Sequence, residues 1–222
     1  VISVNKPFVS PQGEYVTEAE RYHTFRIPAM VVAADGSILV FAEGRRGDGS
    51  DPRGDKKAPI DIVMRRSTDL GRTWGPLMTI DTGFRPDGNL VDFGDPTPVL
   101  DTTSGTVFLF YGQWPDVGAR HPAPGQNAAS QDGNHVVWVR SSADHGKSWS
   151  KRKQVVYPDT PAETADNLYW RQAEPGPGNG IQLSWQNDHK RNGRLLIPAK
   201  RAGSKAPDSA VTVEPFAYYS DD

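Results

Sequence analysis

The segment STDLGRTW, residues 67–74, recurs almost unchanged as SADHGKSW, residues 142–149. A third copy begins with SDD, residues 220–222, where the sequence stops. Recurrence of a short motif at a nearly constant interval is typical of a repeat architecture. We therefore expect three copies of one structural unit along the chain.

Each copy is flanked by runs that are typical of β-strands. IDIVMRRS and GPLMTI flank the first copy, HVVWVRS and KRKQVV flank the second, and PFAYYS precedes the third. The motif suits a hairpin turn, because Asp69 and Asp144 can accept hydrogen bonds from backbone N–H groups and the glycine two positions later tolerates positive φ. The tryptophan that ends each full copy can pack back over the strands.

Further strand pairs lie between the copies. RIPAMVVA and SILVFAEG meet across Asp35-Gly36, PTPVLD and TVFLFYG across Ser104-Gly105, and GIQLSW and RLLIPAK across Asn192-Gly193. Glycine preceded by Asp, Ser or Asn between two apolar runs favours a hairpin. Four antiparallel strands per repeat predict an all-β chain that supplies about three blades of a β-propeller.

Three blades alone would leave strand edges unpaired and blade faces uncovered. We therefore expect residues 1–222 to be part of a larger propeller. Its remainder is expected either as the continuation of the polypeptide or as a second chain.

The composition argues against several classes of function. The 25 basic and 27 acidic residues nearly balance, so the chain has no field that would attract nucleic acid or an anionic membrane surface. No run approaches the roughly 20 apolar residues of a membrane span. There is no cysteine, and the five histidines show no ligand spacing, so we predict no catalytic metal and no cofactor.

Three motifs in a fixed order carry a family resemblance. FRIP (residues 25–28) is followed by AEGRR (residues 42–46) and then by DIVMRRSTDLGRTW (residues 61–74), which contains the repeated turn known as the Asp box. In this order the motifs resemble those of bacterial sialidases, exo-acting neuraminidases with six-bladed propellers. The resemblance implies an exo-α-sialidase that removes terminal sialic acids from sialylated glycans, in a secreted or periplasmic protein that has lost its signal peptide.

The resemblance also implies roles for particular residues. The arginine of FRIP, Arg26, is expected to bind the carboxylate of the sugar, for which a planar bidentate donor on a rigid strand is well suited. The alternative is an arginine paired with a core acid such as Glu43. For the general acid, which protonates the departing glycosidic oxygen, we choose Asp51, with Asp55 as the alternative.

Two further residues of the pattern point to a hydroxyl subpocket. Arg45 and Asp95 match family positions that reach the sugar on the ring side away from the leaving group, where together they can donate to and accept from one hydroxyl. An ordinary surface ion pair is the alternative. We expect Glu43 to hold an arginine in place. Asn179 is a candidate for substrate contact, although a structural role is favoured.

Sialidases differ from most retaining glycosidases in using a tyrosine nucleophile. A neutral nucleophile avoids repulsion by the carboxylate on the anomeric carbon, provided that a glutamate takes the phenol proton. The resemblance implies that this Tyr/Glu pair lies beyond Asp222. Two alternatives stay open, namely a non-catalytic Asp-box propeller used as a binding module, and a glycosidase or trans-sialidase acting on a related nonulosonic acid.

Overall fold

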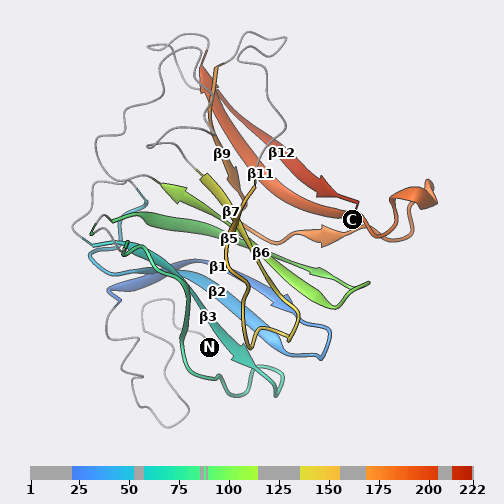
Figure 1. Ribbon diagram of the computed structural model, residues 1–222, viewed down its shortest axis with the longest axis horizontal. Helices are drawn as coiled ribbons and strands as arrows, with labels where there is room; N and C mark the ends of the chain where they lie inside the picture. Colours follow the sequence, from blue (N-terminus) through green and yellow to red (C-terminus); the bar gives the residue numbers. More distant parts are fainter. Residues whose placement is uncertain are drawn as a thin grey trace.

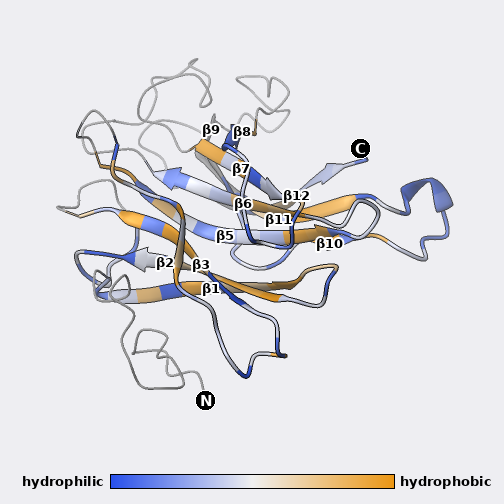
Figure 2. Cartoon of the chain, turned by 60° about the horizontal axis from the view of Figure 1, so that its bottom comes forward, coloured by the Kyte–Doolittle hydropathy of each residue, from blue (hydrophilic) through white to orange (hydrophobic). Residues whose placement is uncertain are grey.

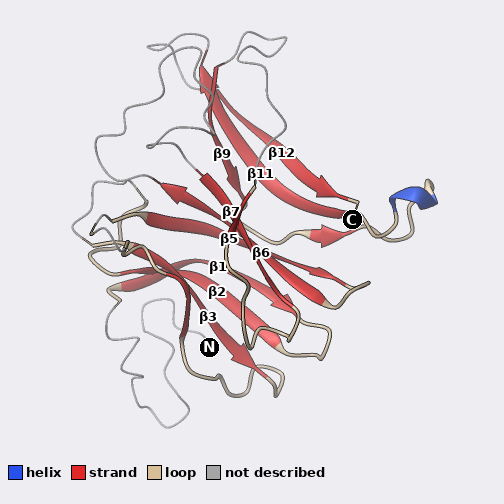
Figure 3. Ribbon diagram, viewed as in Figure 1, coloured by secondary structure: helices blue, strands red, loops and turns tan. Residues whose placement is uncertain are grey.

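The computed structural model describes residues 22–52, 58–85, 88, 90–114, 136–155, 169–204 and 212–221. Among these residues the regular structure is β-strand, apart from a single short 3-10 helix (Figures 1 and 3). The strands fall into three groups that follow one another along the chain, and each group is one antiparallel unit of four strands (Figure 1). This arrangement agrees with the predicted three blades.

The first blade contains β1 (Thr24–Val32), β2 (Ile38–Arg45), β3 (Ile60–Ser67) and β4 (Met78–Asp81). Each strand pairs antiparallel with the next in sequence. The predicted first hairpin is confirmed, with Val32 opposite Ile38 at its closed end. The first Asp box connects β3 to β4, as the sequence predicts.

The second blade repeats this order with β5 (Asp92–Asp101), β6 (Thr106–Trp114), β7 (Val136–Ser142) and β8 (Lys153–Gln154). One parallel pair, Ile60 with Asp92, joins it to the first blade. The two blades therefore share one hydrogen-bonded sheet but meet at a single point of it.

The third blade differs in its first strand, which is interrupted. β9 (Tyr169–Pro175) and β10 (Ile181–Gln182) both pair with β11 (Leu195–Ser204), which then pairs with β12 (Thr212–Ser220). The predicted hairpin between GIQLSW and RLLIPAK is confirmed, but only two residues of its first arm are strand. The connection carries the helix η2 (His189–Arg191).

The Asp boxes form the same turn in both blades. Asp69 accepts hydrogen bonds from the backbone N–H of Thr73 at 2.8 Å and from its hydroxyl at 2.6 Å, while the hydroxyl of Ser67 donates to the same carboxylate at 2.8 Å. Asp144 has the equivalent contacts. Positive φ extends to the residue before each glycine, since Leu70 and His145 both have φ of 62°.

The core lies between the blades. Phe41 and Ile62 from the first blade pack with Phe93 and Leu109 from the second, and the Asp-box tryptophan Trp149 contacts Phe41 edge-on with ring centroids 5.7 Å apart. A second cluster joins the second and third blades through Val99, Leu195 and Ile197. Figure 2 shows apolar residues along the strands and polar ones in the turns. Burial on both faces of the sheets explains why apolar and polar residues do not alternate regularly along the strands.

The first strand of each blade is kinked at the same place. The pairing register shifts in β1 between Arg26 and Ala29 and in β5 between Gly94 and Thr97. In these two kinks Ile27 and Asp95 have φ of 53°, and each precedes a proline. In the third blade Gly176, with φ of 59°, precedes a proline in the same way. A β-branched residue at positive φ is unusual, so the kink is strongly specified by its surroundings.

Candidate active site

The three kinks converge on one cleft. Ile27, Asp95 and Pro177, one from each blade, line a space of about 540 Å³, a size within the usual range for small-molecule sites. The cleft is also lined by four charged residues that the sequence indicates, Arg26, Glu43, Arg45 and Asp51. Four further lining residues were not predicted, namely Pro52, Trp114, Glu174 and Lys200. The repeat therefore builds the cleft by bending equivalent strands toward it.

Arg26 faces this cleft from β1. One face of β1 is exposed there, with Met30 and Val32 as well as Arg26. Nη1 of Arg26 donates to Oδ1 of Asp51 at 2.9 Å, and the Arg26 side chain is 46% exposed. The alternative from the sequence was an ion pair between Arg26 and Glu43. The ion pair that Arg26 forms in the structure is with Asp51.

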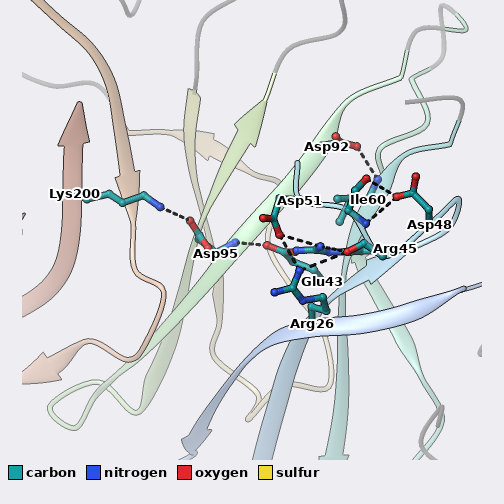
Figure 4. Close-up of polar contacts among 11 residues, drawn as sticks. Arg26, Glu43, Arg45, Asp48, Asp51, Ile60, Asp92, Asp95 and Lys200 are labelled. Atoms are coloured by element: carbon teal, nitrogen blue, oxygen red, sulfur yellow. Dashed lines mark hydrogen bonds and ion pairs between the residues drawn. The ribbon is translucent and has the colours of Figure 1, made fainter. Parts of the chain in front are cut away.

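Asp51 lies on the loop between β2 and β3 and is 69% exposed. The same Oδ1 also accepts from Nη1 of Arg45 at 3.1 Å (Figure 4). Asp48 shapes the loop, since its carboxylate accepts from the backbone N–H of Ser50 at 2.8 Å. Asp55, the alternative acid, lies outside the described residues.

Arg45 and Glu43 form a buried ion pair next to Asp51. Both side chains are 1% exposed, and Nε and Nη2 of Arg45 donate to Oε2 of Glu43 at 2.9 and 2.5 Å. The other carboxylate oxygen, Oε1, accepts from the backbone N–H of Asp95 at 3.1 Å. Burial raises the pKa of Glu43, and the adjacent Arg45 opposes that rise. Glu43 thus holds both Arg45 and the kink of β5.

Asp95 is brought to the cleft by the kink of β5 and is 7% exposed. Its Oδ2 lies 3.4 Å from Nζ of Lys200, which lies 2.9 Å from Oε2 of Glu174 (Figure 4 shows the Asp95 contact). Burial raises the pKa of Asp95; the charge of Lys200 opposes this rise and that of Glu174 adds to it. The cleft therefore contains three basic and four acidic side chains in close contact.

Asn179 connects the third blade to the first. Its Oδ1 accepts from the backbone N–H of Met30 at 3.4 Å, and its Nδ2 donates to the carbonyl oxygen of the same residue. A side-chain amide bound to both backbone groups of one residue acts as a structural bridge between the blades, the role that the sequence favours for it.

Lys200 and Glu174 line the cleft but were not predicted from the sequence as site residues. Lys200 lies in RLLIPAK, which is typical of an ordinary strand, and Glu174 begins EPGPGNGIQL, in which only Asn179 is a candidate for substrate contact. A usable signal exists in hindsight: FRIP, FGDP and EPGP place a proline at the same point of each repeat. Aligning the repeats on this proline would have marked the third blade as part of the cleft.

Comparison with known proteins supports the fold and the family. The family model described as BNR repeat-like domain matches residues 17–222. A sialidase from Micromonospora viridifaciens is 32% identical over 98% of this chain and 30% of its own length. Sialidase-4 from Homo sapiens is 29% identical over 96% of the chain and 41% of its own length. The chain thus spans less than half the length of these relatives.

Solved structures show the same architecture. Hadza microbial sialidase Hz136 aligns with 89% of this chain and 39% of its own, with a TM-score of 0.65 at 21% identity. Trypanosoma rangeli sialidase in complex with sialic acid aligns with 98% of this chain and 31% of its own, with a TM-score of 0.62 at 20% identity. The predicted fold class is confirmed: the chain supplies about three blades of a six-bladed β-propeller.

The motifs, the fold and the sequence relatives lead to one assignment. The chain belongs to the BNR repeat-like family and, within it, to the sialidases. Among the described residues, no helix is long and apolar enough to cross a membrane.

Proposed function

We propose that residues 1–222 are the N-terminal half of the catalytic propeller of an exo-α-sialidase, which hydrolyses terminal sialic acids of glycoconjugates with retention of configuration. The observation that carries the proposal is the direct contact of Arg26 with Asp51 at the cleft, 2.9 Å between Nη1 and Oδ1. An exposed cation for the substrate carboxylate thus lies beside an exposed group that can transfer a proton.

Arg26 is proposed to bind the sugar carboxylate. Its side chain extends from β1 and is partly exposed. A bidentate, charge-assisted pair of hydrogen bonds from a guanidinium binds a planar carboxylate strongly. The contact with Asp51 uses Nη1, so Nε and Nη2 are the nitrogens from which a bidentate pair would be built. Further cations for the clamp are proposed to come from outside residues 1–222.

Asp51 is proposed to be the general acid and base. In the first step it gives its proton to the glycosidic oxygen as the bond from that oxygen to the anomeric carbon breaks, while the phenol oxygen of a tyrosine forms the new bond and its proton passes to the glutamate. In the second step Asp51 takes a proton from water, which attacks the same carbon and releases the tyrosine, and the glutamate returns the phenol proton. The Tyr/Glu pair is proposed to lie outside this chain, since no tyrosine lines the cleft formed by the described residues.

Arg45 and Asp95 are proposed to border the subpocket for a sugar hydroxyl. Both line the cleft, and Glu43 contacts each of them. Because Glu43 accepts from Arg45 and from the backbone of Asp95, it is proposed to position these two residues rather than to react.

The test is hydrolysis of a fluorogenic α-sialoside by the full-length polypeptide that contains this chain. We expect release of the fluorophore and of free sialic acid by wild type, and a lower rate in Asp51→Ala. A full-length protein that binds sialosides without cleaving them would contradict the enzymatic proposal. Formation of a transferred sialoside instead of free sialic acid would replace hydrolysis by transfer.

A further inference from the structure

Lys200 enters the cleft from the third blade, on the side of Asp95 away from Arg26 and Arg45 (Figure 4). It is a residue of β11, and its cross-strand neighbour on β9 is Glu174. Its side chain is 42% exposed, whereas those of its two acidic partners are 5% and 10% exposed. An accessible ammonium group is therefore held by two buried carboxylates from different blades.

The contacts leave Lys200 with a donor for a ligand. Its Nζ lies 2.9 Å from Glu174 and 3.4 Å from Asp95. An ammonium group carries one more N–H donor than these two contacts use. Because the two carboxylates are buried whereas the Lys200 side chain is 42% exposed and lines the cleft, we place the remaining donor on the side of the cleft.

Arg45 offers much less to a ligand. Its Nε and Nη2 donate to Glu43, and its Nη1 donates to the carbonyl oxygen of Gly49 and to Asp51. All of its nitrogens thus have protein acceptors, and its side chain is 1% exposed. Lys200, by contrast, is a partly exposed donor next to Asp95.

We propose that Lys200 and Asp95 bind one hydroxyl group of the sugar, with Lys200 as donor and Asp95 as acceptor, and that this pair determines specificity for that hydroxyl. The inference rests on the proposed sialidase function. Glu174 acts as a positioning residue, because its paired carboxylate fixes the ammonium group next to Asp95. A lysine stem alone would have far more rotational freedom.

Hydroxyl recognition by a charged donor and a charged acceptor is selective. A site built to pair with a hydroxyl rejects the analogue that lacks it, since its own buried polar groups are then left unpaired. The hydrogen bond from a charged donor contributes enough for about a 10- to 100-fold effect on kcat/KM. Loss of Lys200 should therefore weaken binding of the natural sugar while affecting its hydroxyl-free analogue little.

The experiment compares sialosides that each lack one hydroxyl group, at C4, C7, C8 or C9, with the parent sialoside. The full-length polypeptide is assayed as wild type, Lys200→Met, Lys200→Arg and Asp95→Asn. Lys190→Met is the matched control, because Lys190 is an exposed lysine of η2 in the same blade and lies outside the cleft.

We expect Lys200→Met to raise KM for the parent sialoside about 10- to 100-fold with a smaller change in kcat. For one deoxy analogue, wild type and Lys200→Met should have the same kcat/KM, and Asp95→Asn should lose its effect on that same analogue. Lys200→Arg should recover part of the affinity, and Lys190→Met should match wild type.

A uniform loss on all substrates would show that Lys200 is structural and would overturn this inference while leaving the sialidase function in place. The same conclusion would follow if Lys200→Met and Asp95→Asn responded to different hydroxyls. If Lys200→Met does not fold, the comparison is made with Lys200→Arg, whose altered geometry should still be selective for one hydroxyl. A wild type that hydrolyses no sialoside would overturn the proposed function and this inference together.

Discussion

Arg26 and Arg45 donate to the same oxygen atom, Oδ1 of Asp51, at 2.9 and 3.1 Å. The two guanidinium groups differ greatly in accessibility, since the Arg45 side chain is 1% exposed and that of Arg26 is 46% exposed. Arg45 also donates to the carbonyl oxygen of Gly49 at 2.6 Å, so it anchors the loop that carries Asp51. A carboxylate that binds to Arg26 therefore approaches an acid that is already fixed in place.

This relationship predicts how the activity of Asp51→Ala depends on the leaving group. A general acid matters most when the departing alcohol is a poor leaving group, and its loss typically costs about 10²- to 10⁴-fold in rate. We expect a loss of that size with natural sialyl-lactose and a clearly smaller one with a nitrophenyl sialoside. The measurement is kcat/KM of the full-length polypeptide on both substrates.

Two variants in the same loop serve for comparison. Asp48→Asn should retain activity on both substrates, because the asparagine amide oxygen can still accept from the backbone N–H of Ser50 and Asp48 is absent from the cleft lining. Asp55→Ala tests the other candidate acid. If Asp55→Ala shows the leaving-group dependence and Asp51→Ala does not, the assignment of the acid to Asp51 is wrong.

The two Asp-box glycines predict unequal costs for the same substitution. Gly71 and Gly146 have φ of 80° and 84°, so an alanine at either position is strained by about 1–2 kcal/mol. A Cβ at Gly146 would lie 2.7 Å from the side chain of Leu39, which is fully buried, whereas a Cβ at Gly71 would lie 3.6 Å from Trp74. Urea unfolding should show that Gly146→Ala loses about 1–3 kcal/mol more than Gly71→Ala. Equal losses would mean that Leu39 moves aside freely.

The Asp-box carboxylates predict a loss of stability in acid. Hydrogen bonds from the Thr73 side chain and backbone hold the pKa of Asp69 at about 2, below its ordinary value of 3.8. Because the folded pKa is the lower one, this stabilisation is complete above about pH 4 and is lost as the pH falls toward 2. The urea midpoint should therefore fall less between pH 5 and 2 in Asp69→Asn than in wild type. Parallel curves for the two proteins would exclude this contribution.

The sequence predicted the blades well because their signals are local. Each Asp box carries its own turn chemistry, and each Gly-containing pair marks its own hairpin, so no long-range information is needed. The cleft depends on contacts between blades, which local patterns do not record. Lys200 meets Asp95 only because the kinks of β5 and of the third blade face one space. The motifs predicted that Arg26 and Asp51 belong to one site. They did not predict that Arg26 and Arg45 donate to the same oxygen atom of Asp51.

The ion pair of Glu43 and Arg45 gives the last prediction, which concerns stability. Glu43→Gln keeps the shape of the side chain but leaves the Arg45 guanidinium buried with its nearest counter-charge removed. Removing one partner of a buried pair typically costs about 3–5 kcal/mol, whereas an exposed pair contributes about 1 kcal/mol or less. We expect Glu43→Gln to lower the free energy of unfolding by about 3 kcal/mol, and Asp188→Asn, which removes the exposed partner of Arg191, to change it by less than about 1 kcal/mol. Urea unfolding of the full-length polypeptide at neutral pH measures both. If the two variants were equally stable, Asp51 alone would suffice as the counter-charge of Arg45, and Glu43 would not be needed to hold the loop.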